Sequence, residues 1–151
     1  MAGPTQYSKP GTSVAHLELA LEGRLSDAEL LYNASHVTSA IVSFVYAVEI
    51  QLKILICRHL DLEKLPRAFE IHDLQELIVL TGLSRRVSLK GEDESPIVES
   101  WSLLTKISND ITNMRYGPPD DQEMATATDV RSYVIHDQKG IIPWLLRQTQ
   151  T

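Results

Sequence analysis

The chain has 151 residues, of which 43% are hydrophobic and 23% charged, and these values fit one soluble globular domain. Its formal net charge of −6 argues against a general nucleic-acid binder, which usually needs a basic face, although it permits a local basic site. The single cysteine, Cys57, excludes an internal disulfide and fits a reducing, cytoplasmic location. We find no signal peptide and expect no membrane association.

The N-terminal part of the chain divides into a leader and a first helix. Residues 1–12 are rich in Gly, Pro and small polar residues, which predicts a disordered leader. A helix should begin near Ser13, because Leu17, Leu21 and Leu25 recur at helical spacing. Residues 33–35 are a plausible turn before the next helix.

Residues 36–60 lie within 24–65, the longest segment of the chain without Gly or Pro, and we expect them to be the central helix. Their β-branched content would permit a strand, but strands rarely exceed about ten residues. Apolar side chains point nearly all round the helix, which predicts that it is buried. Glu49, Gln51 and Lys53 interrupt the apolar sequence, which argues against a membrane span.

The middle of the chain contains a short helix between two connecting segments. Residues 61–66 should be a linker, and residues 68–80 a third helix with Gly82 as its C-terminal cap. Residues 84–95 are charged and contain a glycine, so we expect a solvated loop.

Two further helices complete the prediction. Residues 96–116 should form a helix that begins at Pro96, where proline is favourable, and carries an apolar stripe. Residues 122–138 show a similar apolar pattern and should form the next helix. Residues 144–146 should fold back as an apolar tail turn or contact a partner subunit. No segment is predicted as a strand. Residues 13–147 should therefore form a single all-α domain, an antiparallel bundle of four to five helices.

Glu49 and Lys53 lie four residues apart in the central helix, in the order that favours a helical ion pair. One interpretation is a pair at the edge of the core that extends to water. The other is a partly buried pair that fixes the register of helices or subunits.

Four segments share a pattern with a known family, namely RLSDAE at 24–29, YAVEIQLK at 46–53, HDLQEL at 72–77 and Arg115-Tyr116. Through them the sequence resembles the HEPN domain family over residues 14–138. The resemblance implies an α-helical bundle, usually dimeric, from bacterial toxin–antitoxin and phage-defence systems. Such domains often occur beside a minimal nucleotidyltransferase, which would be a protein partner. Some members are RNases that need no metal, and others have lost the chemistry.

Catalytic members of this family carry an Arg with a His after four to six intervening residues. The His acts as general acid or base on a ribose 2′-hydroxyl, and the Arg stabilises charge on the phosphate. Arg115 matches the position of the family Arg, but Asp120, Asp121 and Gln122 occupy the positions where the His should be. The resemblance therefore implies a non-catalytic module, in which Arg115 and Tyr116 contact a nucleotide, RNA or a second subunit.

The alternative is a metal-independent endoribonuclease that uses Arg131 and His136 as its catalytic pair. A separation of five residues turns two side chains about 140° apart on a regular helix, so they converge only with a bend or a second subunit. Arg67 and His72 have the same spacing, but we expect His72 to cap or pack the third helix. A helical adaptor unrelated to the family is a third alternative, because its bundle would look the same from sequence.

We expect no metal and no cofactor. The five His residues are scattered, without the spacing of metal ligands, and the chain offers only one cysteine. No Gly-rich loop that could hold a phosphate is present.

Overall fold

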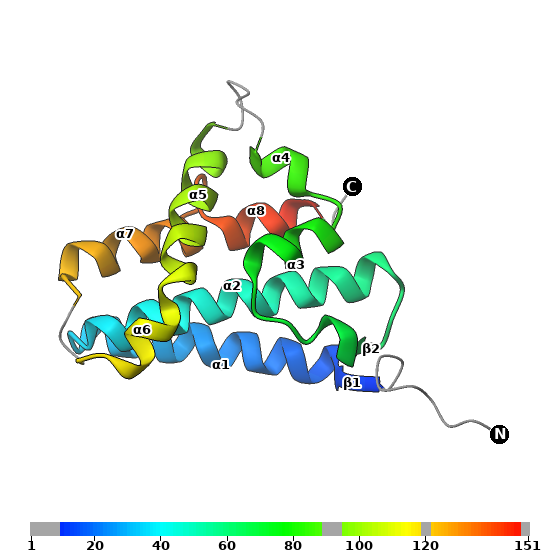
Figure 1. Cartoon of the computed structure of the whole chain (residues 1–151), viewed down its shortest axis with the longest axis horizontal. Helices are drawn as coiled ribbons and strands as arrows, with labels where there is room; N and C mark the ends of the chain where they lie inside the picture. The colour runs from blue at the N-terminus through cyan, green and yellow to red at the C-terminus, as the bar shows by residue number, and fades with distance from the viewer. Residues whose placement is uncertain (1–9, 89–94, 119–121, 149–151) are drawn as a thin grey trace.

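The computed structural model describes residues 10–88, 95–118 and 122–148. Helices account for most of these residues, which confirms the all-α class (Figure 1). The element order is β1 (Pro10–Ser13), α1 (Val14–Asn33), α2 (Val37–His59), β2 (Lys64–Pro66), a 3-10 turn (Arg67–Phe69), α3 (Leu74–Leu80), α4 (Ser84–Ser88), α5 (Ser95–Asn109), α6 (Ile111–Tyr116), α7 (Met124–Ile135) and α8 (Ile141–Gln148).

Helices α1 and α2 form a long antiparallel hairpin along one edge of the molecule (Figure 1). The side chain of Ser13 caps α1 by accepting a hydrogen bond from His16 N at 3.2 Å. Helix α2 is the predicted central helix. It is long and apolar enough to cross a membrane, but 83% of its 18-residue apolar window is buried inside the protein, as in the core helix of a soluble protein.

The remaining helices pack over α2 in two directions. Helices α7 and α8 run roughly along α2, whereas α5 crosses it steeply (Figure 1). Within the described part of the chain there are eight α-helices, so the arrangement is more divided than the predicted bundle of four to five. Each helix still buries one face against α2 or its neighbours, as the layer rules for helical domains require.

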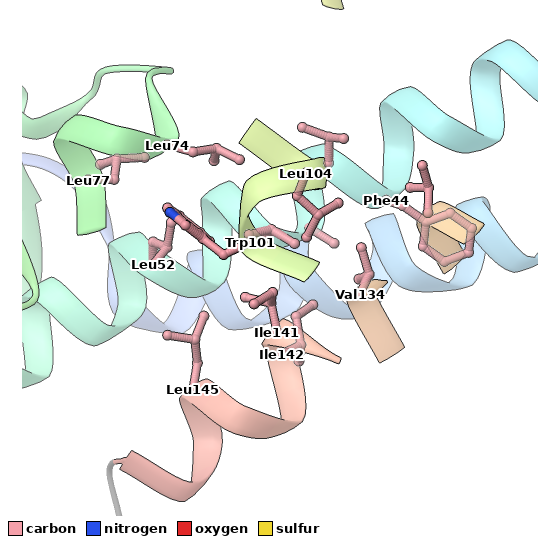
Figure 2. Close-up of a cluster of buried hydrophobic side chains, with 14 of the residues drawn as sticks. Phe44, Leu52, Leu74, Leu77, Trp101, Leu104, Val134, Ile141, Ile142 and Leu145 are labelled. Atoms are coloured by element: carbon pink, nitrogen blue, oxygen red, sulfur yellow. The ribbon is translucent and has the colours of Figure 1, made fainter. Parts of the chain in front are cut away.

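The core lies where α5 meets α2 between α3 and α8. Figure 2 shows Trp101 of α5 beside Leu52 of α2, with Leu104 farther along α5 and with side chains of α3 and α8 on either side. These side chains are almost completely buried, so they supply much of the apolar area that stabilises the fold. The labelled residues from five helices are Phe44, Leu52, Leu74, Leu77, Trp101, Leu104, Val134, Ile141, Ile142 and Leu145.

The predicted helix over residues 96–116 is interrupted at Asp110. Its backbone there has φ −99° and ψ 4°, outside the helical region, and α6 begins at the next residue. The Asp110 side chain accepts a hydrogen bond from Asn113 Nδ2 at 2.7 Å. The prediction of one continuous helix was therefore wrong. No Gly or Pro marks this break in the sequence, and a side-chain hydrogen bond between Asp110 and Asn113 accompanies it.

A two-stranded antiparallel sheet ties the start of the chain to the segment after α2, where the sequence predicted no strand. Residues 1–9 of the predicted leader lie outside the described residues, and residues 10–12 belong to β1. The prediction missed this sheet because its strands are short and both contain proline.

The third helix begins later than predicted. Residues 67–69 form a 3-10 turn, and α3 starts at Leu74 after Asp73, whose carboxylate accepts from the backbone N–H groups of Gln75 and Glu76 at 2.8 and 3.4 Å. Gly82 follows the end of α3 with φ 79°, a left-handed conformation that suits its predicted capping role.

The segment predicted as a charged loop contains a short helix. Residues 84–88 form α4, which buries Val87 against the core. Residues 89–94 of the predicted loop lie outside the described residues.

The predicted tail turn is a helix, α8. Pro143 lies in its first turn, where backbone N–H groups have no partner within the helix, so proline is tolerated there. The chain turns from α7 into α8 at Gly140, whose N–H donates to His136 O at 2.7 Å. A Cβ added at Gly140 would lie 2.5 Å from that oxygen and 2.6 Å from His136 N, so only glycine fits without a backbone shift.

Candidate functional site

Two arginines and two tyrosines gather where α6 meets α1 and α2, and we call them the arginine–tyrosine cluster. The guanidinium carbons of Arg24 and Arg115 lie 5.6 and 5.8 Å from the ring centroid of Tyr46. Arg115 also lies 5.5 Å from the ring centroid of Tyr116. These distances are those of cation–π contacts. The cluster joins residues from three helices that are far apart in sequence.

Both arginines of the cluster lack an ion-pair partner within the part of the chain that the structure describes. Tyr116 is 78% exposed, so its ring is open to solvent. In a chain with a net charge of −6, two guanidinium groups that contact the same tyrosine ring and have no ion pair among the described residues are a local exception. They satisfy the electrostatic requirement for binding an anion.

Beside the cluster lies a surface depression of about 450 Å³, which we call the α2–α6 depression. Thr38 is only 5% exposed, and its Oγ1 has no hydrogen-bond partner among the described residues. A buried hydroxyl without a partner is costly, so it is a candidate contact for a ligand or an ordered water. The depression is lined by Thr38, Ser39, Val42, Ser43, Met114, Arg115, Tyr116 and Gly117.

The arrangement provides the three elements that nucleotide binding uses. Guanidinium groups of Arg24 and Arg115 can hold a phosphate, and the exposed Tyr116 ring can stack on a base. The hydroxyl of Thr38 can form a hydrogen bond to the sugar or base. Among the described residues that line the α2–α6 depression there is no His, Asp or Glu.

The candidate catalytic residues Arg131 and His136 line a different depression, of about 670 Å³, at the end of α7. Arg131 Nε donates to Glu29 Oε1 at 2.9 Å, and its guanidinium carbon lies 5.4 Å from the ring centroid of Tyr32. Arg131 therefore joins α7 to α1. The structure brings the predicted pair to one depression, but it places Arg131 in an ion pair.

His136 is exposed and ends α7, and its ring is held by the following backbone. Its Nδ1 accepts hydrogen bonds from the N–H groups of Gln138 and Lys139 at 3.1 and 3.3 Å. These bonds need the lone pair of Nδ1, so in the neutral ring the proton lies on Nε2. In this geometry the free nitrogen of His136 is a proton donor and not a base.

Glu49 and Lys53 form a buried pair on α2. Lys53 Nζ lies 3.1 Å from Glu49 Oε2, and each side chain is 9% exposed. His72, the residue before the α3 cap, places Nδ1 3.1 Å from Glu49 Oε1. The interpretation in which this pair extends to water is therefore wrong. Its carboxylate is buried, and the contact with the exposed His72 links α2 to the segment before α3 at the edge of the core.

Cys57 is buried near the end of α2 and borders a third depression, of about 580 Å³. Burial raises the pKa of its thiol, which keeps it protonated and weakly nucleophilic. Cys57 therefore packs as a small hydrophobe in the core. Among the described residues, no group of three or more His, Cys, Asp or Glu side chains could hold a metal ion.

Sequence reasoning identified Arg115 and Tyr116 but missed three of their neighbours. Arg24 and Tyr46 occur in the segments that carry the family resemblance, yet nothing in their spacing shows that they meet. Thr38 gives no sequence signal, because a threonine near a helix start is ordinary. Only the packing of α1, α2 and α6 brings these residues together.

Comparisons with protein-family models, curated proteins and solved structures find no match to this chain. The functional proposal therefore rests on side-chain geometry and on the sequence resemblance to HEPN domains.

Proposed function

We propose that the chain is a non-catalytic helical module of the HEPN type that dimerises and binds a nucleotide in the α2–α6 depression. Nucleotide binding is supported by two guanidinium groups that contact the Tyr46 ring and form no ion pair among the described residues. It is also supported by the buried Thr38 hydroxyl, which has no hydrogen-bond partner among those residues. The family assignment rests on the motifs around Arg24, Tyr46 and Glu49. The setting that this assignment suggests is a cytoplasmic toxin–antitoxin or phage-defence system, with a nucleotidyltransferase-type protein as a partner.

The proposed binding mode assigns one part of the ligand to each group. The phosphate lies against Arg115 and Arg24, and the base stacks on Tyr116. Thr38 Oγ1 gains a partner that it lacks in the described residues. A charged hydrogen bond is worth about 1.5–3 kcal/mol and a neutral one about 0.5–1.5 kcal/mol. Arg115 should therefore contribute more to affinity than Thr38.

The test is calorimetric titration of the purified protein with AMP, ATP, GMP and GTP. We expect wild type to bind at least one of them, Arg115→Ala to weaken binding by about tenfold or more, and Thr38→Val by a few-fold. Arg85→Ala is the matched control, because it removes the same charge from α4, outside the depression. It should bind as wild type does.

Three outcomes would contradict the proposal. These are no binding by the wild type to any of the four nucleotides, equal loss in Arg115→Ala and Arg85→Ala, and binding that is insensitive to salt. The last applies because attraction between an exposed guanidinium and a phosphate is screened by added salt.

The second candidate function is a metal-independent endoribonuclease at Arg131 and His136. The observation that favours it is that both residues line one depression. In this function His136 would protonate the leaving group as an imidazolium, in which Nδ1 no longer accepts from the N–H groups of Gln138 and Lys139, and the base would come from another group. RNA cleavage in EDTA that disappears in both His136→Ala and Arg131→Ala would support it. Intact RNA after incubation with wild type would favour the binding module.

A further inference from the structure

The outward face of α1 carries an uncharged stripe, which we call the α1 stripe. Its residues are exposed, and its two large members, Leu19 and Leu30, are 65% and 67% exposed. At 100° per residue the stripe falls within about 100° of arc, opposite the face that packs on α2. A Cβ added at Gly23, in the middle of the stripe, would meet nothing within 4 Å among the described residues. The stripe consists of Ala15, Leu19, Gly23, Ser26, Leu30 and the C-cap residue Ala34, and the exposed polar residues His16 and Asn33 lie at the two limits of the same arc.

The order of these residues is symmetric about one point. Counted outward from the midpoint between Arg24 and Leu25, the stripe has a small residue, then a leucine, then an alanine in both directions. An antiparallel copy of α1 centred on that point would place Leu19 against Leu30 twice. Gly23 and Ser26 would meet at the centre, where small side chains let two backbones approach. A two-fold interface requires this self-complementarity, in which each contact occurs twice.

The charges beside the stripe fit the same arrangement. Three glutamates flank it on one side, and two of them form ion pairs: Glu18 with Arg58 at 2.7 Å and Glu29 with Arg131 at 2.9 Å. Glu22 forms no ion pair among the described residues. In the antiparallel copy Glu22 would lie opposite the Glu29–Arg131 pair of the second chain. Arg131 is 40% exposed in its side chain, so it can face both carboxylates.

We propose that the α1 stripe is the surface on which a second copy of this chain packs, antiparallel and two-fold, α1 against α1. This inference identifies the interface of the proposed dimer, and it rests on the proposal that the chain dimerises. Nucleotide binding does not depend on it, because Arg24 lies about 130° round the helix from the centre of the stripe. Both α2–α6 depressions would stay open in the dimer.

The first test is light scattering after size-exclusion chromatography across a concentration series. We expect a wild-type dimer, and a dissociation constant raised by about tenfold or more in Leu19→Asp and in Leu30→Asp. Val79→Asp is the matched control, because Val79 is 60% exposed on α3, away from α1. It should dimerise as wild type does. A wild-type monomer at all concentrations, or a dimer unaffected by both leucine variants, would overturn the proposal.

The second test fixes the direction and register of the helices by disulfide cross-linking. Leu19→Cys mixed with Leu30→Cys should form a cross-linked dimer, whereas each variant alone should not, because its two cysteines would be about 16 Å apart. Cross-linking of Leu19→Cys with itself would indicate parallel helices and would overturn the proposal. Cys57 is buried and should not contribute.

A nucleotide titration of the Leu30→Asp protein separates this proposal from the nucleotide site. We expect unchanged nucleotide affinity with weakened dimerisation. A wild type that dimerises through the stripe but binds no nucleotide would support the interface and would contradict the nucleotide site alone.

Discussion

Lys53 Nζ donates a hydrogen bond to Glu49 Oε2 over 3.1 Å, one turn apart on the most buried helix of the protein. Surface pairs of this spacing contribute little, because water competes for both charges. Here both side chains are 9% exposed, and the carboxylate also contacts His72 at the start of α3. The pair therefore links the central helix to a neighbouring element at the edge of the core.

Removal of one partner of this pair should destabilise the protein strongly. Lys53→Met leaves the Glu49 carboxylate buried with only an exposed histidine beside it, which should cost about 3–5 kcal/mol of unfolding free energy. The double variant Glu49→Leu/Lys53→Met replaces both charges with apolar groups and should lie much closer to wild type. Urea denaturation measures the unfolding free energies of both variants, and an unchanged m-value shows that the difference is one of stability. A loss below about 0.5 kcal/mol in Lys53→Met would show that the pair is effectively solvated.

The junction of α5 with α2 should be sensitive to lost volume. Leu104 is completely buried, so Leu104→Ala should lower the unfolding free energy by about 2–5 kcal/mol. Val79→Ala on the exposed side of α3 is the control and should change it by about 0.5 kcal/mol or less. Chemical denaturation compares the two. Equal effects would mean that α5 is not packed as Figure 2 shows it.

The phenol of Tyr133 should ionise at unusually high pH. Burial, and then the carboxylates of Asp129 and Glu99, raise the pKa of Tyr133 above its ordinary value. The folded state thus favours the neutral phenol. This contribution to stability is complete below the unfolded pKa of about 10 and is lost as pH rises through the folded pKa.

Ultraviolet titration of phenolate absorbance tests this shift. Wild type should show a late-ionising tyrosine that is missing in Tyr133→Phe and is shifted to lower pH in Asp129→Asn. A titration of Tyr133→Phe that keeps the late component would assign it to another tyrosine.

The start of α3 should depend on its cap. The Asp73 carboxylate accepts from two backbone N–H groups, so Asp73→Ala should cost about 1 kcal/mol. Asp73→Asn keeps an acceptor at the same place and should retain most of the stability. Thermal unfolding followed by circular dichroism compares the three proteins. A Tm for Asp73→Ala equal to that of wild type would mean that solvent caps this helix equally well.

The long helices were predictable because their signals are redundant. Residues 37–59 have neither Gly nor Pro and are apolar on every face, so length and burial followed from local sequence. The break at Asp110 and the short helix around Val87 carry weak local signals and depend on packing. The sheet between β1 and β2 joins segments more than fifty residues apart, a contact that periodicity does not report.

The candidate site was predicted only in part for the same reason. Arg115 and Tyr116 were found by their place at a helix end, whereas Tyr46 could have been any apolar-face residue of α2. The sequence leaves the burial of Glu49 and Lys53 open, because the all-round apolar helix favours a buried pair whereas the charge spacing also suits a pair that reaches water. The partner His72 lies 23 residues away from Glu49 and was assigned a capping or packing role at the third helix.

Gly140 has a consequence for how this protein tolerates substitution. It follows the turn at 137–139 and is buried, and any side chain there would collide with the backbone of His136. In saturation mutagenesis scored by protein abundance, we expect Gly140 to be as intolerant as a core position, even toward alanine. Because it has no Cβ, Gly140 can approach the backbone of His136 closely at the connection between α7 and α8.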